Sequence, residues 1–288
     1  MLSLPKILAP VDFSERSPGA AHFAGALACH FKSELTLLHV VDTASYAWAN
    51  FEFLLSDLPA LLEAEARKAL ETFLTDRFRN MKVKRLVRSG DPAHEIVEYA
   101  HAENIDLIVL PTHGYGTFRR FILGSVAAKV LHDADCPIFT GVHMPDAPSL
   151  ETLHFQHIVC AVDLGPQSGP ALDWAFQFAS EFGATLTVVH ITPLLQGHPG
   201  EYFDPGWRTH LERQATEVIE RLQESIGAKG EFFVDEGADI AKTVCSTAGR
   251  LQADLMVIGR STGDGLLGRL RTNAYGIIRQ SPCPVVSI

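Results

Sequence analysis

The stretch LPKILAPVDFSERS, from Leu4 to Ser17, decides the fold because the chain repeats it as FQHIVCAVDLGPQS, from Phe155 to Ser168. Each copy is a short aliphatic run that ends in Val-Asp, with a serine soon after, so that Asp12 and Asp163 correspond. A short apolar run bounded by turn-forming residues is typical of a buried strand. The chain therefore holds the same strand and the same strand end twice.

Three further pairs of segments match in the same order along the chain. They are ELTLLHVVD (Glu34–Asp42) with ATLTVVHITP (Ala184–Pro193), IDLIVLPTHG (Ile105–Gly114) with ADLMVIGRST (Ala253–Thr262), and DCPIFT (Asp135–Thr140) with PCPVVSI (Pro282–Ile288). The repeat has the size of a whole domain, which indicates a duplication and not a solenoid. We expect a first domain over residues 1–144, a second over 153–288, and a linker over about 141–152.

Strands and helices alternate within each copy. In the first copy we expect strands at Lys6–Val11, Leu35–Val41, Val83–Arg88, Leu107–Leu110 and Pro137–Thr140, and helices at Ala20–Phe31, at Leu58–Phe78 and from Asp91-Pro92 onward. Strands that are apolar on both faces are typical of a parallel sheet covered by helices, and the crossovers of such sheets are right-handed. The fold class is therefore α/β, with two doubly wound parallel five-stranded sheets in tandem.

Composition limits the functional classes. The chain has 288 residues, 47% hydrophobic and 20% charged, and a formal net charge of −10, which fits two globular domains and disfavours a nucleic-acid binder. We find neither a secretory signal nor a membrane-spanning apolar run, so we expect no membrane partner. The five cysteines are scattered and form no CxxC pair, which favours a reducing cytoplasm.

The candidate site is the edge where the strands of the first copy end, because doubly wound sheets bind ligands at their carboxyl ends near the topological switch point. The segments that reach this edge contain Pro10, Val11, Asp12, Val40, Val41, Leu110 and Pro111, and Pro111 begins PTHGYGTFRRFILGSVAAKVL. In that loop Gly124 lets a phosphate approach the backbone, and Ser125 offers a hydroxyl and an amide at a helix N-terminus. Arg119 and Arg120 add positive charge, and His113 is a candidate for orienting phosphate.

These features resemble the universal stress protein family. Its ATP loop reads Gly, two residues, Gly, nine residues, Gly and Ser or Thr, and the resemblance extends to Pro10–Ser14, Leu37–Val40 and Cys136-Pro137. The resemblance implies an adenine nucleotide α-hydrolase-like fold with strand order 3-2-1-4-5. It also implies ATP as the ligand of the first domain, with Mg²⁺ as an optional companion.

The family's site residues are carried over position by position. Gly114, Gly124 and Ser125 correspond to phosphate ligands, Val126 supplies an amide, and Asp12, Val40 and Val41 correspond to positions near adenine and ribose. This sequence departs from the pattern at Pro111, which replaces the first glycine and has no N–H to offer.

The second copy departs further. Gly259 keeps the first glycine, but Thr262 replaces the second, and Arg271-Thr272 stands where the first copy has Gly124-Ser125. An arginine there would fill the phosphate space, so we predict that the second domain has a degenerate nucleotide loop. The alternative is that its glycine- and arginine-rich loop holds some other anion.

The leading hypothesis is an ATP-binding module of stress response or signalling. The alternatives are a slow ATPase or a self-phosphorylating enzyme with Ser125 or Thr117 as acceptor, and a nucleotide-free structural adaptor. We assign no catalytic or metal-binding residue, and we interpret the pair His154 and His157 as packed or solvated.

One expectation concerns the two halves as partners. The resemblance implies that Ile138–Thr140 pairs with Val285–Ile288 in an intramolecular pseudo-dimer with a pseudo-twofold axis. Further homodimerisation is left open.

Overall fold

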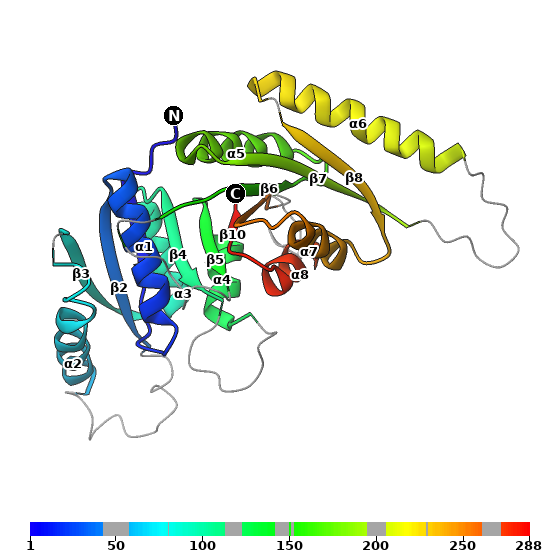
Figure 1. Cartoon of the computed structure of the whole chain (residues 1–288). Coiled ribbons are helices and arrows are strands. Elements are labelled where there is room, and N and C mark those ends of the chain that lie inside the picture. Colours follow the sequence, from blue (N-terminus) through cyan, green and yellow to red (C-terminus); the bar gives the residue numbers. More distant parts are fainter. Residues whose placement is uncertain are drawn as a thin grey trace, which may run out of the picture. The chain divides into compact units, whose positions relative to one another are not determined.

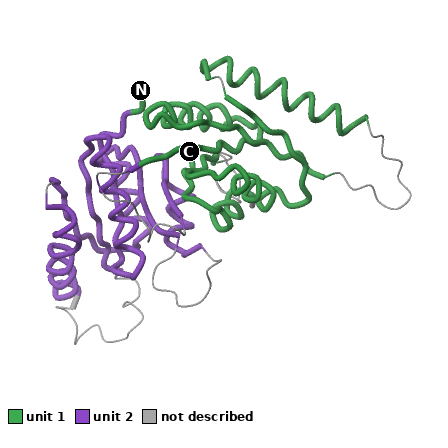
Figure 2. The backbone as a smooth tube through the Cα atoms, viewed as in Figure 1, with its two compact units in different colours: residues 1–2, 154–288 green, residues 3–153 purple. Residues whose placement is uncertain are grey.

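The computed structural model describes residues 1–42, 58–79, 81–112, 123–141, 150, 153–194, 206–228, 230–260 and 272–288. The chain divides into two compact units, Ser3–Leu153 and His154–Ile288, with Met1–Leu2 assigned to the latter (Figure 2). Each unit, described by itself, is an α/β domain that contains five strands.

The first unit contains five strands and four helices among its described residues. They are β1 (Lys6–Pro10), α1 (Ser17–Phe31), β2 (Glu34–Asp42), α2 (Leu58–Thr72), β3 (Val83–Gly90), α3 (Pro92–Ala102), β4 (Leu107–Pro111), α4 (Ser125–Asp133) and β5 (Ile138–Gly141). The sheet order is β3-β2-β1-β4-β5, and its strand pairs are parallel. Figure 1 shows α1 in front of this sheet and α3 and α4 behind it.

The second unit repeats this arrangement. Its elements are β6 (His157–Ala161), α5 (Ser168–Phe182), β7 (Thr185–Pro193), α6 (Gly206–Ile226), β8 (Glu231–Gly237), α7 (Ile240–Arg250), β9 (Leu255–Ile258), α8 (Thr272–Gln280) and β10 (Val285–Ser287). The order β8-β7-β6-β9-β10 is again parallel throughout, which confirms two doubly wound five-stranded sheets of order 3-2-1-4-5. The expected pairing of the last strands concerns the placement of one half on the other and stays a prediction.

Both sheets are sandwiched by apolar side chains. Leu8, Leu107 and Val257 are fully buried in the central strands of their sheets. Burial of one such aliphatic side chain stabilises the fold by about 1.5–3 kcal/mol. Side chains from the helices complete each core, and Leu27 of α1 and Phe178 of α5 are also fully buried.

Two expectations about helices have different outcomes. Asp91 is the N-cap of α3, because its side chain accepts a hydrogen bond from the N–H of His94 at 3.0 Å and Pro92 follows, as predicted. The helix expected over Leu58–Phe78 instead ends at Thr72. Leu74 has a φ of 52°, a left-handed conformation that an α-helix cannot continue through.

In both units an aspartate at the start of the fourth strand fixes the alignment of that strand with the first strand. The Asp106 carboxylate accepts from the N–H of Lys6 at 2.8 Å, and the Asp106 N–H donates to the Lys6 carbonyl at 3.0 Å. In the second unit Asp254 accepts from the N–H of His157 at 3.0 Å and donates to its carbonyl at 2.8 Å. The two strands therefore start at the same level, so their carboxyl ends also meet at one edge.

A histidine on the second strand holds the end of the first strand in both units. Nδ1 of His39 lies 2.7 Å from the Val11 carbonyl, and Nδ1 of His190 lies 2.8 Å from the Val162 carbonyl. Because a carbonyl can only accept, each Nδ1 carries the proton. Burial lowers the pKa of His39, although the Val11 carbonyl and the nearby Asp12 charge oppose this shift.

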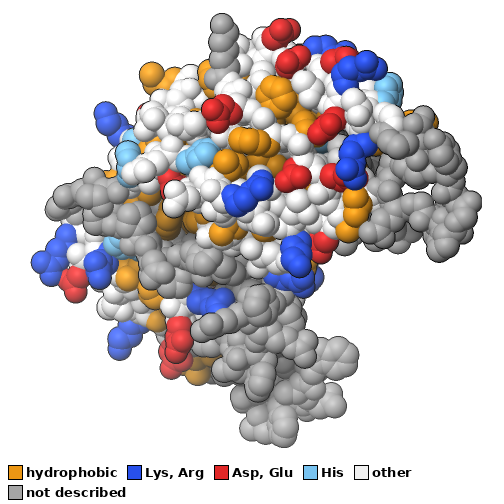
Figure 3. Space-filling model, turned by 45° about the vertical axis from the view of Figure 1, so that its right-hand side comes forward, with side chains coloured by type: hydrophobic (Ala, Val, Ile, Leu, Met, Phe, Trp, Pro, Cys, Tyr) orange, Lys and Arg blue, Asp and Glu red, His pale blue; other side chains and the backbone are white. Residues whose placement is uncertain are grey.

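On the face shown in Figure 3, basic and acidic side chains lie interspersed with hydrophobic ones. None of the helices in the described part of the chain has the length and apolar content needed to cross a bilayer.

Gly276 gives a first testable prediction about packing. Its α8 helix lies beside α7, and a Cβ built on Gly276 would lie 2.7 Å from the Cβ of Ala241. We expect Gly276→Ala to lower the free energy of unfolding by about 1–2 kcal/mol, because overpacking against a backbone-fixed methyl outweighs the helix propensity gained. Thermal unfolding measures the change.

The control for this prediction is Gly249→Ala in α7, where an added Cβ meets nothing within 4 Å. That variant should unfold at the same temperature or a higher one. The double variant Gly276→Ala with Ala241→Gly should recover most of the loss. If Gly276→Ala is as stable as Gly249→Ala, the close approach of the two helices is wrong.

His39 gives a prediction about pH. Its pKa is lower in the folded state than in the unfolded state, so the unfolded chain takes up the proton first as the pH falls. The neutral side chain thus contributes its full stability above about pH 6.5, and stability is lost as the pH falls from there through the folded pKa. The slope for this one proton cannot exceed about 1.4 kcal/mol per pH unit.

The test compares native protein with His39→Asn, whose amide can still donate to the Val11 carbonyl but does not titrate. The free energy of unfolding, measured in urea at pH 7.5 and 5.5, should fall less in the variant than in the native protein. An equal fall in both would contradict the assignment of this pH dependence to His39.

Candidate functional site

The candidate site of the first unit lies where β1, β2 and β4 end. β1 pairs with β2 on one side and β4 on the other, and it is the strand from which the order reverses. Pro10 is in register with Leu38, and the N–H of Val11 continues this pairing by donating to the Leu38 carbonyl at 2.8 Å. The structure thus places Pro10, Val11 and Asp12 at the switch point of a doubly wound sheet.

The Asp12 carboxylate is fixed by the residues that begin α1. Its Oδ1 accepts hydrogen bonds from the Ser14 N–H at 3.0 Å, from the Ser14 hydroxyl at 2.6 Å, and from the Ser17 hydroxyl. Ser17 also accepts from the N–H of Asp12 at 3.0 Å. One carboxylate oxygen is therefore occupied by hydrogen bonds from the same loop. These bonds set the orientation of Asp12 before any ligand binds.

Ser17 was not singled out in the sequence, although a signal for it exists. The spacing from Asp12 to Ser17 recurs from Asp163 to Ser168, where the hydroxyl donates to the Asp163 carboxylate at 3.2 Å. A serine repeated at the same distance from a repeated aspartate indicates a shared contact.

Val40 and Val41 lie in the last part of β2, in register with Arg88 and Ser89 of β3. Val41 is buried and Val40 is half-buried. Successive side chains of a strand point to opposite faces of the sheet. Only one of the two valines can therefore line a given side of the site with its side chain, while both offer backbone atoms.

The N-terminus of α4 is tied directly to the end of β4. Gly124, the N-cap, donates its N–H to the carbonyl of Thr112 at 2.8 Å, one residue beyond Pro111. The first intrahelical bond runs from the Ala128 N–H to the Gly124 carbonyl at 2.8 Å. The N–H groups of Ser125, Val126 and Ala127 thus have no acceptor within the helix, and such groups together with the helix dipole favour an anion.

The backbone at Gly124 does not itself require glycine. Its φ of −62° and ψ of 150° are open to any residue, and no side chain caps the helix there. The value of glycine at this position would be the absence of a Cβ beside the amide groups. Ser125, the first residue of α4, is exposed.

The remaining predicted residues of the first half have mixed placements. Leu110 is buried and in register with Thr140, and Pro111 is half-buried and in register with Gly141. His113, Gly114, Thr117, Arg119 and Arg120 lie outside the described residues.

The second unit has a cavity at the equivalent edge. It has a volume of about 440 Å³ and lies at the ends of β6, β7 and β9 against α7 and α8. Gly259 follows β9 there, and a Cβ on it would lie 2.9 Å from the Cβ of Gln167. The sequence predicted only a degenerate phosphate loop in this half, and not a cavity.

His157 makes a structural contact, and the Cys160 and Cys283 thiols are buried. Nε2 of His157 lies 2.7 Å from the Thr187 hydroxyl. The described parts of the chain contain no group of three or more His, Cys, Asp and Glu side chains placed to hold a metal. Burial raises the pKa of the Cys160 thiol to about 12 and that of Cys283 to about 11, which keeps both protonated and unreactive at neutral pH.

Several proteins similar to this chain are universal stress proteins. A universal stress protein of Mycolicibacterium smegmatis is 25% identical over 291 residues, covering 98% of this chain and 96% of that protein. One from Methanocaldococcus jannaschii is 34% identical over 135 residues, which is 46% of this chain and 79% of that protein. The crystal structure of a universal stress protein from Archaeoglobus fulgidus has the same fold, with a TM-score of 0.71, 22% identity and coverage of 99% and 98%.

The model of the universal stress protein family matches residues 4–140 and again residues 154–288. These matches cover both repeated sheets and the strand ends that form the candidate sites. The chain belongs to the universal stress protein family, of which it carries two domains in tandem.

Proposed function

We propose that the first half binds ATP and that the protein acts as a nucleotide-dependent module of stress response or signalling in the cytoplasm. The observation that carries the proposal is the hydrogen bond from Gly124 to Thr112, which sets an N-terminus without a side-chain cap at the end of β4. The phosphates would accept from the amides of Ser125 and Val126. The nucleoside would lie over the ends of β1 and β2, beside Val11, Asp12 and Val40.

The described residues fit the nucleotide better than they fit a protein-held metal ion. Mg²⁺ at a nucleotide site is held by the phosphates and one or two carboxylates. Asp12 is the carboxylate at the end of β1, and its Oδ1 already accepts hydrogen bonds from Ser14 and Ser17. Any Mg²⁺ would therefore be carried mainly by the phosphates.

Ser125 favours a second candidate function. It is exposed as the first residue of α4, so its hydroxyl would lie next to a phosphate bound at that N-terminus. A self-phosphorylating enzyme with Ser125 as acceptor, or a slow ATPase, is the resulting alternative. A binding module is the function that we favour, because the printed contacts of Asp12 go to Ser14 and Ser17 of its own loop and not to Ser125.

The ATP proposal predicts the effect of Gly124→Val. Valine adopts the extended backbone of Gly124 readily, so α4 should still begin at Ser125, while the added side chain blocks the approach of a phosphate. We expect ATP affinity, measured by isothermal titration calorimetry, to fall by about tenfold or more, the cost of lost hydrogen bonds to a charged group. Gly249→Ala in α7, which meets nothing within 4 Å, is the control and should bind ATP normally.

Unchanged affinity in Gly124→Val would remove α4 from the site. A native chain that purifies without nucleotide, as shown by native mass spectrometry, and that gives no thermal shift with ATP would support a structural adaptor instead.

Turnover separates the two remaining functions. A binding module should release ADP over several hours no faster than Gly124→Val does at the same concentration of protein and ATP. A Ser125→Ala variant tests the acceptor hypothesis in the same assay, with phosphorylated protein detected by intact mass. Faster release of ADP by native protein, or a gain of one phosphoryl group that Ser125→Ala abolishes, would establish the enzyme.

A further inference from the structure

We propose that the outer side of β3 in one copy of the protein binds the outer side of β8 in a second copy, with the two strands antiparallel. In the described part of the chain β3 pairs with β2, β8 pairs with β7, and each stands last in its sheet order. The outer side of such a strand presents backbone N–H and C=O groups that can extend the sheet into another chain. The proposal does not depend on ATP binding.

The two outer strands carry charges of opposite sign. The β3 segment Lys82–Arg88 reads KVKRLVR, with four basic residues and no acidic one, and we call it the basic edge. The β8 segment Glu231–Glu236 reads EFFVDE, with three acidic residues and no basic one, and we call it the acidic edge. Like charges placed opposite each other destabilise a strand pair, so neither edge favours a second copy of itself. The same charges favour the pairing of the basic edge with the acidic edge.

The side chains of the basic edge that share the α3 face are fixed by contacts within the chain. Nζ of Lys84 lies 5.4 Å from the centre of the Tyr99 ring on α3. Arg88 forms an ion pair of 3.1 Å with Glu95 on the same helix. Because alternate residues of a strand point to one face, Leu86 lies between the two basic side chains on this face.

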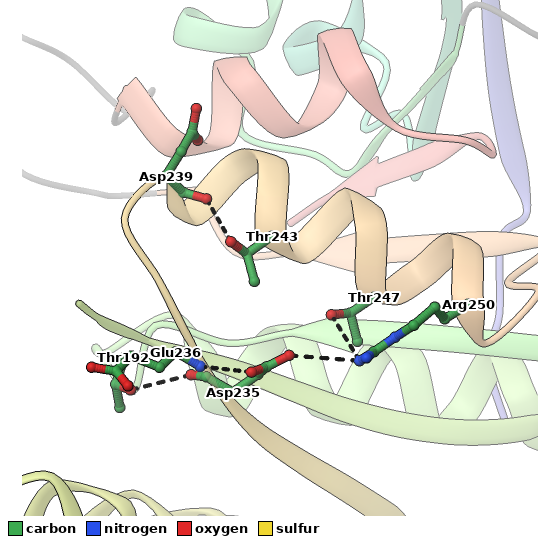
Figure 4. A network of polar contacts seen from close by, with 7 residues as sticks. All are labelled: Thr192, Asp235, Glu236, Asp239, Thr243, Thr247 and Arg250. Carbon is green, nitrogen blue, oxygen red and sulfur yellow. Dashed lines mark hydrogen bonds and ion pairs between the residues drawn. The ribbon is translucent and has the colours of Figure 1, made fainter.

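The α7 face of the acidic edge has the complementary composition. The Asp235 carboxylate lies 3.6 Å from Arg250 of α7 (Figure 4). Glu236, the next residue, forms its ion pair of 2.6 Å with α6 on the opposite face. By the same alternation Phe233 and Glu231 share the face of Asp235. Phe233 is 40% exposed, which is unusual for a phenylalanine and leaves an apolar surface between two carboxylates.

An antiparallel alignment matches these two faces at every position. It places three pairs opposite each other, namely Lys84 with Asp235, Leu86 with Phe233, and Arg88 with Glu231. Two pairs of opposite charge then flank one apolar pair, and both kinds of cross-strand pair stabilise a sheet. A parallel alignment would turn the second sheet over, so that Glu236 would be the one acidic residue of β8 beside the α3 face. The antiparallel alignment is therefore the better match.

The contacts within each chain are compatible with this pairing. Arg88 would lie between Glu95 and an acidic residue of the second copy. Asp235 would lie between Arg250 and a basic residue of the second copy. Charges of alternating sign thus continue across the contact. Since each copy has one basic and one acidic edge, the contact joins different surfaces of the two copies and leaves a further edge on each for growth or ring closure.

The first test measures self-association of the full native chain by sedimentation velocity. The average mass should rise above that of one chain as the protein concentration increases, and added salt should reduce this rise because it screens exposed charges. Lys84→Glu and Asp235→Lys each place like charges opposite each other in the proposed alignment. Each variant alone should associate about tenfold more weakly than the native chain.

An equimolar mixture of these two variants is the decisive sample. In the mixture the new glutamate at position 84 meets the new lysine at position 235, and the native pair forms from the two remaining edges. Association should therefore return towards the native level, which also shows that both variants are folded. Lys129→Glu, the same change of charge on the exposed side of α4, is the control and should associate like the native chain.

A second test examines the alignment by disulfide formation between chains. Leu86→Cys and Phe233→Cys are made in separate chains that also carry Cys29→Ser, because Cys29 is exposed. On mild oxidation the mixture should form the Leu86–Phe233 cross-link faster than a mixture of Leu86→Cys with Glu231→Cys forms its own. Directly opposite Cβ atoms lie within disulfide reach, and those displaced by two residues do not. Peptide mass spectrometry identifies the products.

The proposal is overturned if the native chain keeps the mass of one chain at every concentration, or if neither charge variant weakens its association. It is equally overturned if the mixture associates no better than the two variants alone. Cross-linking no faster than that of the displaced pair overturns the antiparallel alignment. If a charge variant melts at a lower temperature, Lys84→Gln and Asp235→Asn replace the pair, and unchanged association in both would then contradict the proposal.

Discussion

Both candidate sites depend on one constraint, which is the alignment of the first strand with the fourth along the strand direction. A doubly wound sheet forms its site where the strand order reverses, and here this is the boundary between β1 and β4 and between β6 and β9. Asp106 and Asp254 set this alignment from the opposite edge of the sheet, through paired hydrogen bonds to Lys6 and His157. Each hydrogen bond to a charged group contributes about 1.5–3 kcal/mol, and a slip by one residue would turn every side chain to the wrong face.

Much of the fold could be predicted because its signals are local and repeated. The apolar runs predicted the strands, the duplication predicted the same sheet twice, and Asp91 with Pro92 predicted the start of α3. The end of α2 could not be predicted in this way. Apolar residues continue at helical spacing as far as Phe78, which is indeed buried, but Leu74 takes a left-handed conformation that periodicity does not reveal.

The candidate site was predictable to a different degree in each half. Motif comparison singled out Asp12, Gly124 and Ser125, because a phosphate site would leave a pattern of glycines and a helix start in one segment, and their role stays a prediction. The cavity of the second half leaves no such pattern. Its walls come from strands and helices far apart in the sequence, and residues such as Val244 and Ile277 look like ordinary core residues until the fold brings them together.

The two halves differ in how their paired helices meet. In the first half Lys129 of α4 reaches the Asp91 carboxylate at the start of α3, with 3.2 Å between the charged atoms. The fifth residue of α8, Gly276, takes the position that Lys129 has in α4, and it lies against Ala241 with no room for a Cβ. A cation bridge between helices is thus replaced by close apolar packing, next to the walls formed by Val244 and Ile277.

The end of the first strand also differs between the two halves. Ser14 donates a hydroxyl to Asp12, whereas the second half has Gly165, which has no hydroxyl to give to Asp163. Gly165 offers only its N–H to the Asp163 carboxylate, whereas Ser14 offers both its N–H and its hydroxyl to Asp12. Duplication therefore gave two copies of the same strand edge with different local hydrogen bonds. The aspartate is held by two serines in the first half, and by a serine hydroxyl and a glycine N–H in the second.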